Sequence, residues 1–151
     1  MKLEDALKST RFESERQKAT LNIVYTAYWI KCHFSNAMKE LGLTMEQFNV
    51  MRILRGKHPN AMCVRDIGNR MVETSSNVPR IIDRLVAKNM VNRTTSKSDK
   101  RETLIELTEH GLSQLDIASK LVSQTTNQII GISEVEAQTL NTILEKVRLI
   151  D

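Results

Sequence analysis

Apolar positions recur with helical spacing over most of this chain. From Phe12 to Leu41 they cover more than one face of a single long helix, so we expect more than one partner to bury it. These positions are Ile23, Tyr25, Ala27, Tyr28, Ile30, Phe34, Met38 and Leu41. Gly42 follows the last of them, where a residue in the left-handed conformation can end a helix.

Three shorter helices are predicted next. Thr44 and Gln47 have the spacing of a capping box that opens the second helix of the chain. A third, short helix is expected from about Cys63 to Met71. The fourth is expected over about residues 77–88, because Val78, Ile81, Ile82 and Leu85 repeat at intervals of three and four.

The ends of the fourth helix carry their own signals. Ser76 is the expected N-cap, which places Pro79 at the third helical position, where a missing N–H costs nothing. Asn89 follows the last turn and can adopt the left-handed conformation that ends a helix.

The period then changes from that of a helix to that of strands. Residues 90–95 and 103–107 are rich in β-forming side chains, and the polar segment 96–101 between them predicts a hairpin with a basic tip. Thr108 then opens a fifth helix that reaches about Ile130. Ser133 with Glu136 forms a second capping box and opens a last helix to about Ile150.

The charge distribution sharpens this picture. The 151 residues carry a formal net charge of +4, whereas residues 75–101 alone hold seven basic and two acidic side chains, a net +5. The excess positive charge is therefore confined to the fourth helix and the hairpin, as expected of a nucleic-acid binder. No long apolar run or leader-like N-terminus is present, so we expect a cytoplasmic protein without membrane contact.

Enzymatic and metal chemistry find little support in the sequence. The two cysteines, Cys32 and Cys63, lie far apart and lack the paired spacing of a zinc site, and the three histidines are scattered. We therefore expect no catalytic residues, no metal and no cofactor.

A helix, a turn, a second helix and a basic hairpin together predict a winged helix-turn-helix. The recognition helix would place polar and cationic groups on its outer side, where they can reach base edges and phosphates. These candidates are Ser75, Ser76, Asn77, Arg80 and Arg84. The candidate wing residues are Arg93, Lys97, Asp99, Lys100 and Arg101. The Asp99 carboxylate is expected to hold the Arg101 guanidinium extended, as suits a narrow A·T-rich minor groove.

Three stretches of this sequence resemble the multiple-antibiotic-resistance-regulator (MarR) family of bacterial winged helix-turn-helix transcription regulators. They are residues 41–44 leading into Phe48 and Leu54, residues 76–85, and residues 99–111. The last contains the D-x-R wing signature of the family and its L-T-x-x-G start to the next helix. The sequence departs from the family pattern at Cys63, Pro79 and Asn89, where Thr or Ser, Thr, and Gly respectively are usual.

The resemblance implies a mainly α (α+β) fold, a homodimer and a pseudo-palindromic double-stranded operator. The chain would form one domain, 1–151, with dimerisation helices at 12–41 and 108–151 around a winged helix-turn-helix at 44–107. It also implies repression relieved by a small aromatic ligand bound between the two lobes. The few aromatic side chains are concentrated on the first helix, at Tyr25, Tyr28, Trp29, His33 and Phe34. The first four are the candidate ligand residues, although a role in the dimer core explains them equally well.

Other readings of the sequence remain open. Thr20 aligns with the cysteine of the peroxide-sensing branch of the family and is no thiol, but Cys63 at a helix N-terminus could make a redox-responsive regulator. A buried, inert Cys63 is the simpler alternative. A winged-helix module that binds an acidic protein is another, and a thiol enzyme using Cys63 would need a base that nothing nearby supplies.

Overall fold

The computed structural model describes residues 1–73, 77–96 and 99–149. Its elements in chain order are α1 (Leu3–Leu7), α2 (Glu15–Met38), the 3-10 turn η1 (Lys39–Leu41), α3 (Met45–Arg55), β1 (Met62–Cys63), α4 (Val64–Gly68), α5 (Val78–Ala87), β2 (Val91–Thr95), β3 (Thr103–Leu107), α6 (Glu109–Ile129) and α7 (Glu134–Val147). This is the expected α+β winged helix-turn-helix with additional helices at both ends.

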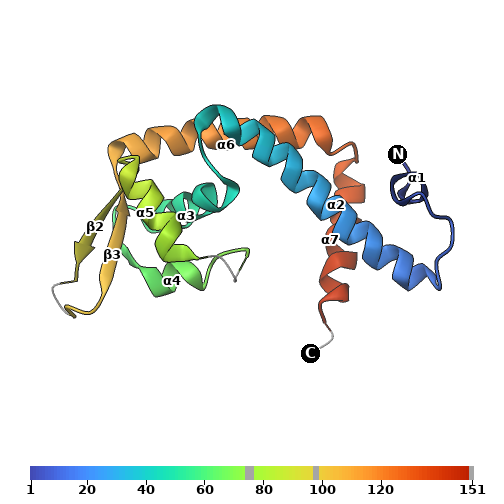
Figure 1. The fold of residues 1–151 in the computed structure, drawn as a ribbon, viewed down its shortest axis with the longest axis horizontal. Helices are drawn as coiled ribbons and strands as arrows, with labels where there is room; N and C mark the ends of the chain where they lie inside the picture. Colours follow the sequence, from blue (N-terminus) through green and yellow to red (C-terminus); the bar gives the residue numbers. More distant parts are fainter. Residues whose placement is uncertain (74–76, 97–98, 150–151) are drawn as a thin grey trace.

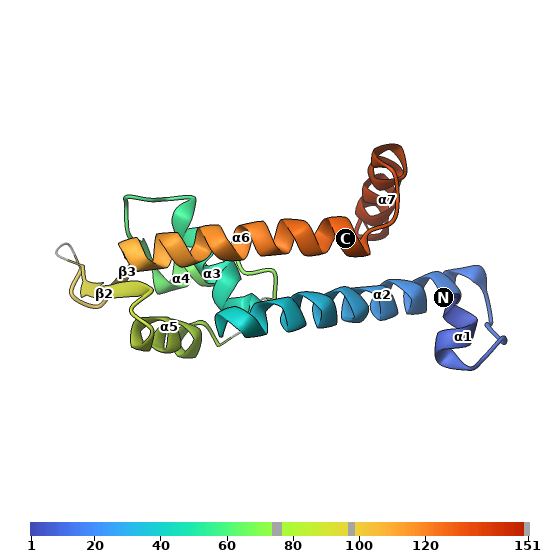
Figure 2. The same ribbon diagram turned by 90° about the horizontal axis from the view of Figure 1, so that it is seen from above.

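The molecule is elongated and has two lobes, a winged lobe and a helical lobe made of α1, α2, α6 and α7 (Figure 1). Helices α3, α4 and α5 and the three strands form the winged lobe at one end. The long helices α2 and α6 pack along each other and lead away from that lobe to α1 and α7 (Figure 2). The ends of these long helices stand apart from the core, and α7 projects away from both.

A small antiparallel sheet forms the wing, with strand order β1-β3-β2. Val91 pairs with Leu107 and Thr95 with Thr103, which confirms the predicted hairpin. The short strand β1 was not predicted from the sequence. It pairs Cys63 with Leu104 and thereby draws Cys63 out of the expected third helix, which begins one residue later and already ends at Gly68.

The core lies in the winged lobe and extends along the start of α6. It is built from side chains of every element of that lobe, because each helix turns one apolar stripe inward. The largest fully buried side chains include Met38, Met51, Leu54, Ile67, Ile82, Leu85, Ile105 and Leu115.

Most predicted helix ends are confirmed. Both capping boxes form, Thr44 with Gln47 and Ser133 with Glu136. Gly42 and Asn89 are left-handed, with φ values of 61° and 55°. The predicted cap of the fourth helix was wrong: Asn77, and not Ser76, caps α5, since its side chain accepts a hydrogen bond from the amide of Arg80.

That change moves Pro79 to the second helical position, where its missing N–H is still harmless. The terminal helices also differ from the expected bounds. Ser14 caps α2, so this helix begins at Glu15 and not at Phe12, and the residues before it form the separate helix α1. The last helix ends at Val147, short of the expected Ile150.

Candidate nucleic-acid interface and ligand cavity

Helix α5 separates its apolar and cationic side chains onto opposite faces. Val78, Ile82 and Leu85 are buried against the winged lobe, whereas Arg80 and Arg84 are exposed. This separation follows from the helical period, because positions three and four apart share a face. The outer face of the predicted recognition helix therefore presents two guanidinium groups to solvent.

The other predicted residues of this helix have different positions. Asn77 is exposed, and its Oδ1 accepts the Arg80 amide at 3.2 Å, so this side chain is partly used as a cap. Ser75 and Ser76 lie outside the described residues. The structure thus places Asn77 and Arg80 at the exposed start of α5 and Arg84 nearer its end, and all three line one groove.

The wing is joined to the recognition helix by an ion pair. Arg93 on β2 contacts Asp83 on the exposed face of α5. Lys100 and Arg101 lie exposed at the tip of the hairpin. Lys97 falls outside the described residues. The guanidinium of Arg93 is therefore engaged within the chain, which leaves Lys100 and Arg101 as the exposed cations of the described tip.

The predicted link between Asp99 and Arg101 takes another form. Asp99 Oδ1 accepts the backbone amide of Arg101 at 2.9 Å, and no ion pair with the guanidinium forms within the described part of the wing. A carboxylate two residues before an amide reaches it as part of a turn, at closer range than the long arginine side chain. Asp99 thus fixes the backbone of the tip, and the Arg101 residue is exposed.

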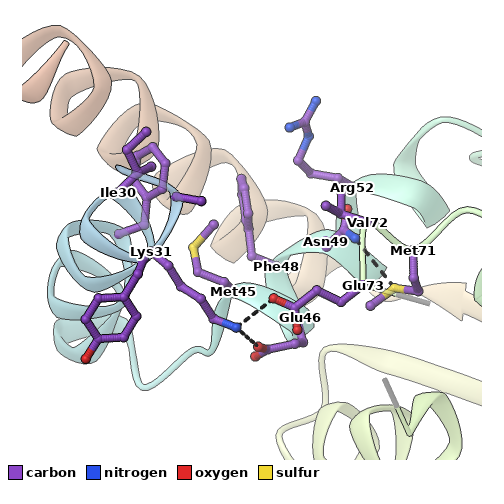
Figure 3. Close-up of a pocket in the computed structure, with 13 residues that line it drawn as sticks. Ile30, Lys31, Met45, Glu46, Phe48, Asn49, Arg52, Met71, Val72 and Glu73 are labelled. Carbon is purple, nitrogen blue, oxygen red and sulfur yellow. Dashed lines mark hydrogen bonds and ion pairs between the residues drawn. The ribbon is translucent and has the colours of Figure 1, made fainter. Parts of the chain in front are cut away.

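An apolar cavity of about 500 Å³ lies between the two lobes, at the contact of α2 with α3 and the segment after α4 (Figure 3). We call it the interlobe cavity. Its apolar walls are Ala27, Ile30, Phe34, Met45, Phe48, Met71 and Val72. Its polar residues are Tyr28, Lys31, Glu46, Asn49, Arg52 and Glu73. A mostly apolar cavity with few polar groups is typical of a small-molecule site.

Only one of the four candidate ligand residues lines this cavity. Tyr28 does, but Tyr25, Trp29 and His33 do not. The reason is helical geometry: at about 100° per residue, the face holding Ala27 and Lys31 lies nearly opposite Trp29. Trp29 and His33 instead pack on each other, with their ring centroids 4.4 Å apart.

The polar end of the interlobe cavity is a three-residue ion-pair cluster that the sequence reading missed. Lys31 Nζ on α2 lies 2.6 Å from Glu73 Oε1 and 3.7 Å from Glu46 Oε1 (Figure 3). The hydrogen bond to Glu73 raises the pKa of Lys31 above its ordinary value. A signal was available, because Lys31 is the single Lys, Arg, Asp or Glu residue between Lys18 and Lys39.

Glu46 is the partly buried member of that cluster. Burial favours its neutral form, yet the pKa of this carboxyl is lowered overall by hydrogen bonds from its own backbone and Thr44 and by the charge of Lys31. Arg52, on another wall of the interlobe cavity, lies over the Phe48 ring at 5.8 Å. The cavity therefore combines an apolar interior with an ion-pair cluster at one end.

Cys63 is shielded in this fold. Its side chain is only 9% exposed, and it precedes α4 without making a side-chain cap. Arg65, the nearest cation in the sequence, pairs with Glu102 at 3.7 Å. The cationic partner that would favour a reactive thiolate is therefore directed elsewhere.

Two structural features are absent from the described residues, 1–73, 77–96 and 99–149. Within these ranges no group of three or more His, Cys, Asp and Glu side chains is placed to hold a metal ion. Over the same ranges, no helix combines the length and apolar character needed to cross a membrane.

A family model and two related proteins match this chain, and the model and one of the relatives carry the same family name. A model described as "MarR family" matches residues 43–103. The chain is 30% identical over 114 residues to the multiple antibiotic resistance protein MarR of Escherichia coli, covering 73% of this chain and 76% of that protein. It is 26% identical over 121 residues to the HTH-type transcriptional regulator MhqR of Bacillus subtilis, covering 80% of this chain and 82% of the relative.

The fold is also similar to solved structures. A mutant MarR from Escherichia coli complexed with operator DNA superposes with a TM-score of 0.77 at 23% identity, covering 92% of this chain and 99% of that one. The similarity extends over both lobes and so includes the long helices beyond the matched model.

Proposed function

Because this chain belongs to the MarR family of winged helix-turn-helix transcription regulators, we propose that it binds a pseudo-palindromic operator in double-stranded DNA as a homodimer. It acts as a repressor that a small aromatic ligand releases. The observation that carries the DNA-binding part is the exposed pair Arg80 and Arg84 on the outer face of α5, together with the exposed Lys100 and Arg101 of the wing tip.

In this proposal the two cationic elements read DNA differently. Arg80, Arg84 and Asn77 enter the major groove, where guanidinium and amide groups match guanine and adenine edges. Lys100 and Arg101 at the wing tip contact phosphates and the adjacent minor groove. The Asp83–Arg93 ion pair would keep the two elements in a fixed relative position.

The homodimer is supported by unpartnered apolar surface. Helix α7 has no buried residue, and four of its apolar side chains, Val135, Leu140, Ile143 and Val147, are between 44% and 72% exposed. On α2, Val24 and Tyr28 are 64% and 68% exposed. A second copy covering α2 and α7 would bury these side chains and set two recognition helices about 10 bp apart on DNA.

The same reasoning supports a division of labour within the single domain 1–151. The dimerisation helices would lie within residues 12–41 and 108–151, and the DNA-reading part within 44–107. The interlobe cavity lies where these parts meet, between α2 and α3. A ligand there would contact both parts at once, so it could change how the winged lobe is held.

Selection of bound duplexes from a random library would test this function, followed by fluorescence anisotropy on the selected sequence over a salt series. We expect a two-fold symmetric consensus with nanomolar affinity. Weak, salt-sensitive binding without sequence preference would contradict it. That result would favour the alternative of a module that binds an acidic protein partner.

A further inference from the structure

Two hollows of the winged lobe share one wall. Besides the interlobe cavity, a polar groove of about 340 Å³ lies against the recognition helix, and we call it the recognition groove. Asn77, Arg80 and Arg84 of α5 line it together with Glu46 and Glu73. The same two glutamates line the interlobe cavity. The wall between the proposed ligand site and the proposed DNA-reading arginines is therefore made of carboxylates.

Lys31 decides which way these carboxylates are directed. Its ammonium contacts Glu73 at 2.6 Å and Glu46 at 3.7 Å, so both acids are held on the side of the interlobe cavity (Figure 3). The lowered pKa of Glu46 and the raised pKa of Lys31 both favour the charged forms of these two groups. One lysine from α2 thus neutralises part of the charge of two acids from the winged lobe.

The arginines on the other side of this wall have no such partner. Within the described ranges, neither Arg80 nor Arg84 takes part in an ion pair. Both guanidinium groups share the recognition groove with Glu46 and Glu73, which are occupied by Lys31. In this state the arginines remain available for DNA.

We propose that Lys31 is a charge switch between the two hollows, set by whether an anionic group of the ligand reaches it in the interlobe cavity. The anion would pair with Lys31 and free Glu46 and Glu73, whose charge would then fall on Arg80 and Arg84 and compete with DNA. This inference rests on the proposed function, because it concerns how the same cavity controls DNA binding.

The required charge of the ligand follows from the direction of the switch. A cationic ligand would itself occupy the two carboxylates and keep them from the arginines, so it would not release DNA. A neutral ligand would leave the Lys31 contacts in place. An anion displaces the carboxylates from Lys31, and Arg52 on another wall adds a second favourable charge.

The switch can be tested without knowing the ligand. Lys31→Met should mimic the ligand-bound state and weaken binding to the selected duplex about tenfold, within the usual range of coupling between two sites. Adding Glu46→Gln and Glu73→Gln to this variant should restore the affinity, because the competing carboxylates are gone. Anisotropy titrations at fixed salt measure both effects.

Lys18→Met is the matched control. It lies on the same helix, removes the same charge and breaks an ion pair of the same 2.6 Å length, to Glu4, but it touches neither hollow. It should bind the duplex like the wild type. Lys31 is about half exposed, so Lys31→Met should fold, and Lys31→Gln serves as a second variant if it does not.

A pair of probes tests the ligand chemistry directly. Naphthalene-2-carboxylate should weaken DNA binding by the wild type, whereas naphthalene-2-carboxamide, of nearly the same shape but neutral, should not. The carboxylate should have no effect on the Glu46→Gln, Glu73→Gln double variant, which should bind DNA about as tightly as the ligand-free wild type.

Several results would overturn the switch. One is wild-type affinity in Lys31→Met and Lys31→Gln; another is failure of the two glutamine substitutions to restore the affinity. Equal release by the carboxylate and the carboxamide would also overturn it, while leaving a ligand-controlled regulator intact. Absence of sequence-specific binding by the wild type would instead remove the proposed function itself.

Discussion

Gly111 shows how strongly one residue can be constrained by its neighbours. Where β3 turns into α6, the Thr108 amide donates to Met90 O at 3.1 Å, and the Thr108 hydroxyl donates to Asn89 O at 2.7 Å. These bonds bring the first turn of α6 against the backbone after α5. A Cβ added at Gly111 would lie 2.0 Å from Met90 O, so this position has no room for a side chain.

Gly111→Ala should therefore destabilise the protein. The new methyl group must push apart two backbone segments, and overpacking of this kind costs about 1–3 kcal/mol. Thermal or urea unfolding followed by circular dichroism would measure the loss. Gly131→Ala is the control, since nothing lies within 4 Å of a Cβ there. Equal stability of the two variants would contradict the close approach at Gly111.

At the scale of elements, the wing consists of a fixed base and a cationic tip. Arg93 attaches its first strand to Asp83 of α5. At the tip, Asp99 holds the backbone amide of Arg101 at 2.9 Å, so the turn is fixed while the Arg101 side chain stays exposed. Neighbouring positions of the tip should therefore differ in what they contribute to DNA binding.

Arg101→Ala should weaken operator binding and reduce the preference for A·T pairs at the flanks of the site, because a guanidinium in a narrow minor groove reads its shape. Lys100→Ala should mainly lower the slope of log affinity against log salt by about one unit, as expected for one lost phosphate contact. Anisotropy on duplexes with A·T or G·C flanks, over a salt series, separates the two. Identical profiles for the two variants would contradict this division.

The elements that the sequence predicted well are those with local causes. The Thr44–Gln47 capping box, the left-handed Asn89 and the hairpin are set by residues within a few positions of one another. The strand β1 could not be foreseen in this way, because two residues become a strand only when β3, some forty positions later, lies beside them. The same pairing moved the start of the predicted third helix from Cys63 to Val64.

The candidate site divides along the same line. The helical period sufficed to put Arg80 and Arg84 on the outer face of α5. On α2 the candidate ligand residues were chosen for their aromatic side chains and not by the helical period. Trp29 was included for this reason, although its position on the helix lies nearly opposite the interlobe cavity. The Lys31–Glu73 contact joins residues 42 positions apart, so only the tertiary structure could reveal it.

At the scale of the whole molecule, the long helices transmit the position of one lobe to the other. Helix α2 reaches the winged lobe through Lys31 and the interlobe cavity, and α6 does so through the Asp116–Arg55 ion pair at 3.0 Å. Their far ends, with α7, carry the apolar surface left uncovered in one chain. Dimerisation would therefore fix the helices against which the winged lobes are held.

Ile143→Lys should weaken the homodimer more than tenfold, because burying an unpaired ammonium in an apolar interface costs about 2 kcal/mol or more. Ile143 is 52% exposed in the single chain and lies on the apolar stripe of α7 with Leu140 and Val147, so the monomer should keep its fold. Sedimentation velocity over a concentration series would measure the dissociation. Gln138→Lys, on the opposite side of α7, adds the same charge and should leave the dimer intact. If both variants sediment as dimers, another surface joins the two copies. Because only a dimer reads two half-sites together, operator affinity should fall in Ile143→Lys in parallel with the loss of dimer and should stay unchanged in Gln138→Lys.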